Sequence, residues 1–112
     1  MEAFDEKGKR LQLSARAIAG LGLGLGQPKS SGNGVLIPYD AVVMVQGQPF
    51  VYLAQAERWF KRHSIKTGLR RGKDIEVVSG LVPKQSVVVL GAFYVRTVEL
   101  DLLAGDEAGH GH

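Results

Sequence analysis

The residues with the clearest metal-ligand chemistry stand at the C-terminal end of the sequence. His110 and His112 flank a single glycine, and Asp106 and Glu107 come shortly before them. Imidazole and carboxylate groups are ligands of Zn²⁺ and Cu²⁺. Because two imidazoles leave the other coordination positions to water or to these carboxylates, we expect weak metal binding at most. A solvated tail without metal is the alternative, and no other cofactor is predicted.

A second group of side chains combines aromatic rings with positive charge. It comprises Arg58, Trp59, Phe60, Lys61 and Arg62. Trp, Phe and Arg are enriched in the energetically important parts of protein interfaces, so we interpret this segment as a partner-binding surface. Core packing of Trp59 or Phe60 is an equally open interpretation. A third is binding of single-stranded nucleic acid, through base stacking on the rings and phosphate contacts with this segment and with RRGK at residues 70–73.

No residue pattern in the chain predicts catalysis. His63 stands beside Ser64, but neighbouring residues of a strand point to opposite faces, so adjacency does not make them a base and a nucleophile. Asp74 and Glu76 share a strand face next to basic residues, which is typical of a solvated surface rather than of an acid/base pair. We therefore expect a protein that is not an enzyme.

A glycine-rich run at residues 20–26 invites comparison with nucleotide-binding loops. Glycines occupy positions 20, 22, 24 and 26, which leaves Leu25 where the G-x-G-x-x-G pattern requires its third glycine. A G-x-x-x-x-G-K-[ST] loop is absent from the sequence as well. The composition of residues 20–34, rich in glycine, serine and proline, instead predicts a flexible connection.

Length and composition indicate one small globular domain. The chain has 112 residues, of which 45% are hydrophobic, and its 14 basic and 11 acidic residues give a net charge of +3. This charge is too small and too dispersed to demand nucleic acid or an anionic membrane as a partner. The absence of cysteine excludes disulfides and thiolate metal sites. The charged opening MEAFDEKGKR does not predict a signal peptide, and no apolar run reaches the roughly 20 residues of a membrane span.

The elements that position these side chains are predicted to be mostly strands. Residues 9–19 alternate between apolar and polar positions, which favours a half-buried strand, although the alanines also fit a helix. Residues 35–103 contain β-branched runs separated by Gly or Pro, with two antiparallel strands joined around Gly47. Residues 58–65 mix charge and bulk on both faces, which indicates an edge strand or a strand pressed against another protein.

The end of the chain is less regular. The run YVRTVELDLL, residues 94–103, fits a last strand or a short helix, and residues 105–112 are predicted to be disordered. Strands at this spacing predict an all-β domain, either a small antiparallel β-barrel or a sandwich. We divide the chain into an N-terminal strand with its Gly/Ser-rich connection (residues 1–34), a β-domain (residues 35–104) and a tail (residues 105–112).

Five short motifs follow one another along the β-domain. They read VLIPYDAVV, GQPFVYL, FKRHSIKTG, IEVVSGL and SVVVLGAF. Their order resembles the C-terminal part of periplasmic adaptor subunits, also called membrane fusion proteins, of tripartite RND-type efflux pumps. The positions that carry the resemblance are Pro38 with Ala41 and Val42, Gly47 with Phe50, Val51 and Tyr52, Thr67 with Gly68, Ser79 through Leu81, and Val88 through Ala92.

The resemblance implies that residues 35–104 are the membrane-proximal β-domain of a non-enzymatic adaptor, and residues 1–34 could be the end of a preceding barrel domain. Such an adaptor docks on an inner-membrane RND transporter and couples it to an outer-membrane channel, through parts that this chain lacks. The His-containing tail resembles those of heavy-metal and cation-efflux adaptors, which implies metal cations as cargo. The implied location is the periplasm at the inner membrane, in an assembly that could hold several copies. Because the helical hairpin, the lipoyl-like domain and the export signal are missing, we expect a fragment, an excised domain or a truncated relative.

Overall fold

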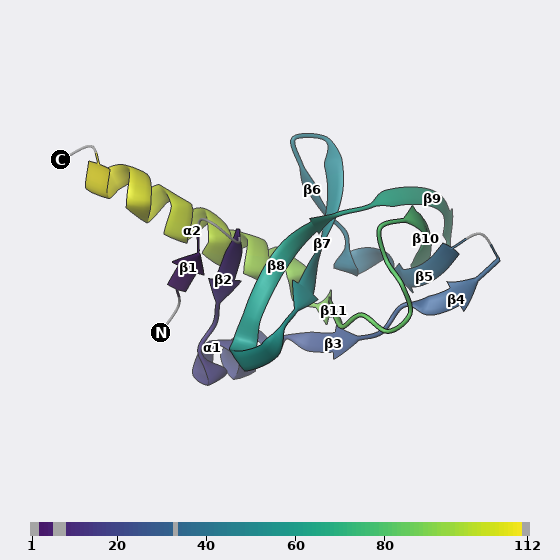
Figure 1. Cartoon of the computed structure of the whole chain (residues 1–112), viewed down its shortest axis with the longest axis horizontal. Helices are drawn as coiled ribbons and strands as arrows, with labels where there is room; N and C mark the ends of the chain where they lie inside the picture. The colour runs from purple at the N-terminus through teal and green to yellow at the C-terminus, as the bar shows by residue number, and fades with distance from the viewer. Residues whose placement is uncertain (1–2, 6–8, 33, 111–112) are drawn as a thin grey trace.

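The strands of the protein form two antiparallel sheets (Figure 1). The computed structural model describes residues 3–5, 9–32 and 34–110, with side chains described up to residue 104. The larger sheet has the strand order β1-β2-β8-β7-β11-β3, and the short strand β6 also pairs with β7. These strands are β1 (Ala3–Asp5), β2 (Arg10–Gln12), β3 (Gly24–Gly26), β6 (Val43–Val45), β7 (Gln48–Ala54), β8 (Trp59–Ser64) and β11 (Val87–Leu90).

The smaller sheet has the strand order β4-β5-β10-β9. Its strands are β4 (Lys29–Ser31), β5 (Gly34–Pro38), β9 (Lys66–Arg71) and β10 (Asp74–Ser79). Two short 3-10 helices, η1 (Tyr39–Ala41) and η2 (Ala56–Arg58), precede β6 and β8. The predicted antiparallel β architecture is confirmed, including the hairpin that joins β6 to β7 around Gly47.

The first hydrophobic core lies between the two sheets. On β5 and β10, Ile37 stands opposite Ile75 and Val35 opposite Val77, so β-branched side chains pair across the inner face of the smaller sheet. The larger sheet contributes from β7 and β11. The buried members of this core are Val35, Ile37, Ala41, Val51, Ile65, Ile75, Val77, Leu81 and Val87.

The second hydrophobic core lies between the larger sheet and the helix α2 (Ala92–His110). Its buried members are Leu11, Leu13, Val43, Tyr52, Phe60, Val88, Ala92 and Val95. Successive residues of one strand enter different cores: Val51 the first and Tyr52 the second, and likewise Val87 and Val88. Strands buried on both faces read as continuous apolar runs, which is why FVYL and VVVL do not alternate.

Residues 94–103, for which the sequence fitted either a last strand or a short helix, belong to the helix α2. Ala92, Val95 and Glu99 are buried at a spacing of three to four residues, which is one face of a helix. The backbone of residues 105–110 continues this helix, as Figure 1 shows at the C-terminal end, where a disordered tail was expected. Once the second core anchors a helix, each further residue adds a hydrogen bond without a new nucleation cost. Residues 111 and 112 lie outside the described part of the chain.

The segment 9–19 forms a strand followed by a helix rather than one strand. After β2, the hydroxyl of Ser14 accepts a hydrogen bond from the Ala17 backbone N–H at 3.0 Å and caps the helix α1 (Ala15–Leu21). A serine at this position satisfies a free N–H of the first turn, and the alanines that follow favour helix. The expectation of a single strand was therefore wrong from Ser14 onward.

Within residues 20–34, β3 and β4 are strands of the two sheets, so the expectation of a flexible connection was wrong there. β3 pairs with β11, with Leu25 opposite Val88, and β4 pairs with β5, with Ser30 opposite Val35. At Gly24, a Cβ atom would lie only 3.0 Å from Cδ1 of Leu90. The glycine allows the Leu90 side chain to lie against this strand, and the backbone of the glycine-rich run is held by the ladder.

The strand predicted at residues 58–65 is present as β8, but it is not an edge strand. β8 lies between β2 and β7, and Phe60 pairs with Leu11 on one side and Ala54 on the other. The N-terminal strands supply the neighbour that the sequence did not reveal. Because β2 pairs with β8 and β1 pairs with β2, the edges of the larger sheet are formed by strands shorter than β8.

Candidate functional site

Four of the five residues predicted to bind a partner lie on β8, where they point alternately to its two faces. Phe60 is 3% exposed and packs in the second core. Arg62 points to the same side, where its Nη1 lies 3.5 Å from Oε1 of Glu99 on α2. Phe60 therefore follows the core-packing interpretation and belongs to no exposed surface, and Arg62 is largely engaged within the domain.

Of the other three residues, Trp59 and Lys61 lie on the opposite, outer face of β8, and Arg58 ends the 3-10 helix η2 directly before this strand. Arg58 and Lys61 are exposed, whereas Trp59 is half-buried beneath the guanidinium of Arg10, 4.5 Å from its ring centroid. Nε of Arg58 donates a hydrogen bond to the carbonyl oxygen of Leu13 at 3.0 Å. This outer face is basic, and its role in partner binding stays a prediction.

The predicted metal ligands cannot be placed. The side chains of His110 and His112 lie outside the described residues. Within the described part, no group of three or more His, Asp or Glu side chains could hold a metal ion. Nε2 of His63 lies 2.6 Å from the carbonyl oxygen of Gly80, a contact in which the ring nitrogen donates. Weak metal binding by the tail stays a prediction.

A buried polar cluster, missed by the sequence interpretation, links α2 to the larger sheet. Glu99 is 3% exposed, and its Oε1 accepts hydrogen bonds from the Tyr52 hydroxyl at 2.8 Å and from Nη1 of Arg96 at 2.7 Å. Arg62 completes the Glu99 cluster, which we define as Tyr52, Arg62, Arg96 and Glu99. Its donors come from β7, β8 and α2, so this one carboxylate connects three elements. The sequence carried one signal for this cluster. If VELDLL is taken as a helix, Glu99 lies on its apolar face, where a carboxylate needs a partner.

The Tyr52 hydroxyl makes stability depend on pH at the alkaline end. Burial raises its pKa, and the Glu99 carboxylate raises that pKa further. An unfolded tyrosine loses its proton near pH 10 while the native one keeps it, so above about pH 10 this group lowers the free energy of unfolding by about 1.4 kcal/mol per pH unit. Urea unfolding from about pH 9 to 11 should show a shallower decline for Tyr52→Phe than for the wild type. Equal slopes would contradict the buried hydroxyl.

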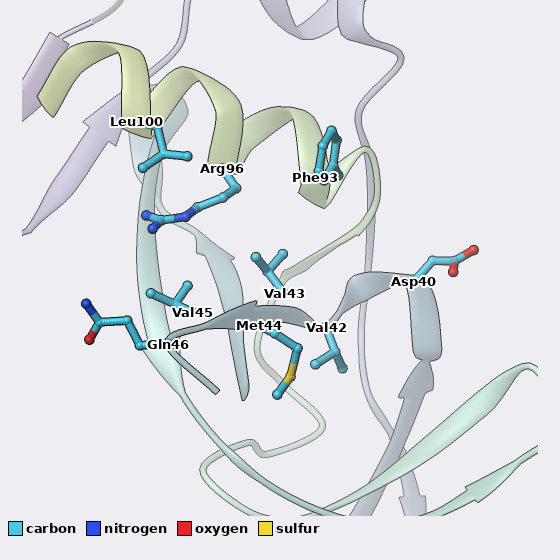
Figure 2. A pocket seen from close by; sticks show the side chains of 9 residues that line it. All are labelled: Asp40, Val42, Val43, Met44, Val45, Gln46, Phe93, Arg96 and Leu100. Carbon is cyan, nitrogen blue, oxygen red and sulfur yellow. The ribbon is translucent and has the colours of Figure 1, made fainter. Parts of the chain in front are cut away.

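A groove of about 410 Å³ lies between β6 and α2 (Figure 2). Figure 2 shows Val43 and Val45 directed toward α2, while Arg96 and Leu100 extend from α2 toward β6. Asp40 lies at the opposite end from the Arg96 guanidinium and points away from the groove. We call this feature the β6–α2 groove; its lining residues are Asp40, Val42, Val43, Met44, Val45, Gln46, Phe93, Arg96 and Leu100.

The β6–α2 groove is bordered by large apolar side chains that no part of the described chain covers. Met44 is 60% exposed, Phe93 is 72% exposed and Leu100 is 48% exposed. A gathering of exposed apolar side chains around one hollow is typical of a contact site, whereas single exposed ones are common on any protein. This arrangement suits binding of a partner.

Comparison with known proteins agrees with the fold. The family model of the CzcB C-terminal circularly permuted SH3-like domain matches residues 35–96. The chain is also similar to the NMR structure of a 180-residue portion of SilB from Cupriavidus metallidurans CH34, which encompasses the N-terminal metal-binding site and the membrane proximal domain of that protein. The sequence identity is 26% and the TM-score 0.55, over 67% of this chain and 44% of the SilB portion. No curated protein sequence matches the chain.

Proposed function

Because the chain belongs to the family of CzcB C-terminal circularly permuted SH3-like domains, we propose that it acts as a non-enzymatic adaptor domain of a tripartite metal-efflux system. The observation that carries this proposal is the family match over residues 35–96, which runs from β5 into α2 and includes all buried residues of the first core and most of those of the second. The similarity to a SilB portion with a membrane proximal domain supports the same assignment.

In this assembly the domain docks in the periplasm on an inner-membrane RND transporter. Other parts of a full-length adaptor then couple the transporter to the outer-membrane channel, with metal cations as the cargo. Among the described residues, no helix has both the length and the apolar character needed to cross a membrane. A docking role is consistent with the exposed apolar side chains that border the β6–α2 groove.

Binding of single-stranded nucleic acid is the less supported function. Base stacking needs aromatic rings with a free face. Phe60 is buried in the second core, and the guanidinium of Arg10 lies over the ring of Trp59. One of the two rings that suggested this function is therefore buried, and an arginine lies over a face of the other.

Lys61→Glu tests the outer face of β8 as part of the docking surface. The variant should bind the transporter, reconstituted in nanodiscs, about fivefold more weakly than the wild-type chain, because charges at the rim of an interface mainly steer association. Lys61 is exposed, so folding should be unaffected. The matched control is Lys84→Glu, another exposed lysine, in the loop before β11. If Lys61→Glu and Lys84→Glu both bound the transporter as tightly as the wild type, the docking surface would lie elsewhere. If the wild type did not bind, docking itself would be contradicted.

A further inference from the structure

The short strand β6 has one unpaired edge, and this edge borders the β6–α2 groove. Among the described strands β6 pairs with β7 alone. Figure 2 shows Val43 and Val45 on one side of β6 and Val42 and Met44 on the other, and all four line the groove. Because successive side chains of a strand point to opposite faces, a hollow lined by both sets runs along the strand's edge.

The hairpin turn determines which backbone groups of β6 face this edge. The two turn residues, 46–47, have positive φ angles of 52° and 78°, and Val45 stands opposite Gln48 across them. The pair that flanks such a turn is hydrogen-bonded, and bonded pairs alternate with non-bonded pairs along an antiparallel ladder. Met44, opposite Pro49, is therefore a non-bonded position. Its N–H and C=O point away from β7, toward the groove.

The walls of the groove supply apolar contact on both faces of a strand placed beside β6. On the α2 side stand Leu100 and Phe93, and on the other side stands the Met44 side chain, all substantially exposed. A segment lying along the edge of β6 would direct alternate side chains to these two sides. The groove therefore offers both an unpaired backbone and apolar surface for alternate residues.

The groove also contains positive charge that the contacts among the described side chains do not fully balance. Arg62 and Arg96 share the single carboxylate of Glu99, which leaves an excess of one positive charge in the Glu99 cluster. Arg96 contacts Glu99 through Nη1, and a guanidinium carries further donors that can bind a second carboxylate. Since Asp40 points away from the groove, an acidic side chain is the complementary group at the Arg96 end.

We propose that the β6–α2 groove binds an extended segment of the RND transporter by strand addition to the free edge of β6. The segment pairs with the N–H and C=O of Met44, lays apolar side chains against Leu100 and Phe93, and places one carboxylate at Arg96. Added strands are recognised in this way, with backbone hydrogen bonds giving affinity and alternate side chains giving specificity. The identity of the partner rests on the proposed function, whereas the mode of binding rests on the edge, the walls and the charge.

Hydrogen exchange of the Met44 amide tests the pairing without any substitution. The complete chain is allowed to exchange alone and in complex with the transporter in nanodiscs, then released and read residue by residue by NMR. Because the Met44 N–H becomes hydrogen-bonded in the added ladder, its exchange should slow by about tenfold or more in the complex. An unchanged exchange rate at Met44 in a saturated complex would overturn strand addition.

A set of variants separates the backbone contact from the side-chain contact. Met44→Pro removes the outward N–H, and proline is tolerated where a strand's N–H faces solvent, so the chain should fold. This variant should lose about tenfold in affinity for the transporter, whereas Met44→Ala, which keeps the N–H, should lose about threefold. Leu69→Ala is the matched control, because Leu69 is 70% exposed on β9 of the other sheet. Its affinity should equal that of the wild type.

The outcomes distinguish this inference from the proposed function. If the wild-type chain binds and Met44→Pro binds equally well, strand addition is overturned while the adaptor function stands. If the wild-type chain does not bind the transporter, both the proposed function and the transporter segment as occupant of the groove are overturned. Protection of Met44 in the chain alone at high concentration, with a doubled mass, would identify a second copy as the occupant and overturn the transporter segment.

Discussion

Replacing Glu99 with alanine is expected to lower the free energy of unfolding by about 2–4 kcal/mol. The substitution removes the acceptor of the Tyr52 hydroxyl and of the Arg96 guanidinium. It also leaves the positive charge of Arg62 without its partner. Removing one member of a buried charged group costs more than the group contributes, because the remaining members stay desolvated.

The partial exposure of the two arginines limits this cost. The side chains of Arg62 and Arg96 are 28% and 18% exposed, so water can reach part of each guanidinium after the substitution. The buried Tyr52 hydroxyl has no such access, since that residue is 0% exposed. The expected loss is therefore dominated by the hydroxyl and by the contact between α2 and the larger sheet.

Two further variants define the origin of the effect, all measured by urea unfolding at neutral pH. Glu99→Gln keeps the shape and one acceptor oxygen, so it should cost less, about 1–2 kcal/mol. Asp101→Ala removes a carboxylate from an exposed position on the same helix and should stay within about 0.5 kcal/mol of the wild type. If Glu99→Ala matched Asp101→Ala, the cluster would not hold α2 to the sheet.

Replacing Gly34 with alanine is expected to lower the free energy of unfolding by about 2–3 kcal/mol. A Cβ atom on Gly34 would collide with the backbone carbonyl oxygen of Val77 on the neighbouring strand β10. A backbone atom cannot turn aside as a flexible side chain can, so β5 and β10 must separate. That separation loosens the pairing of Val35 with Val77, and both side chains belong to the first core.

Gly20→Ala provides a control of opposite sign. Gly20 lies in α1, and a Cβ atom there would meet no heavy atom within 4 Å. Alanine in a helix is more favourable than glycine by about 0.5–1 kcal/mol, so this variant should be more stable than the wild type. A loss of similar size in both variants would show that the chain is generally intolerant of alanine at glycine positions, and would refute the specific collision at Gly34.

The order of the motifs was sufficient to identify the family. The five motifs between residues 35 and 93 resembled the C-terminal part of efflux adaptors, and the family match over residues 35–96 confirms that resemblance. The same runs predicted β5, the β6–β7 hairpin, β10 and β11, because β-branched residues bounded by Gly or Pro favour strands wherever they are placed.

Local pattern was insufficient where an element depends on a distant neighbour. The glycine-rich segment has little propensity of its own, yet it forms β3 because the ladder of β11 lies beside it. The residues of α2 fit both strand and helix. They form a helix because its apolar side chains bury one face of β7 and β11 in the second core. Phe60 was predicted to lie at an interface. In the structure, β2 pairs with one edge of β8, and α2 packs on the face of β8 that carries Phe60.

The sequence by itself determined the family, the strand-rich body and the absence of a catalytic pattern, because these depend on residue types and their order along the chain. Only the tertiary structure revealed the Glu99 cluster and the β6–α2 groove, because each joins residues that are far apart in sequence. Tyr52 and Glu99 are 47 positions apart and meet at 2.8 Å. Burial of a carboxylate is tolerable only where donors converge on it, and the packing of α2 on the larger sheet creates that convergence.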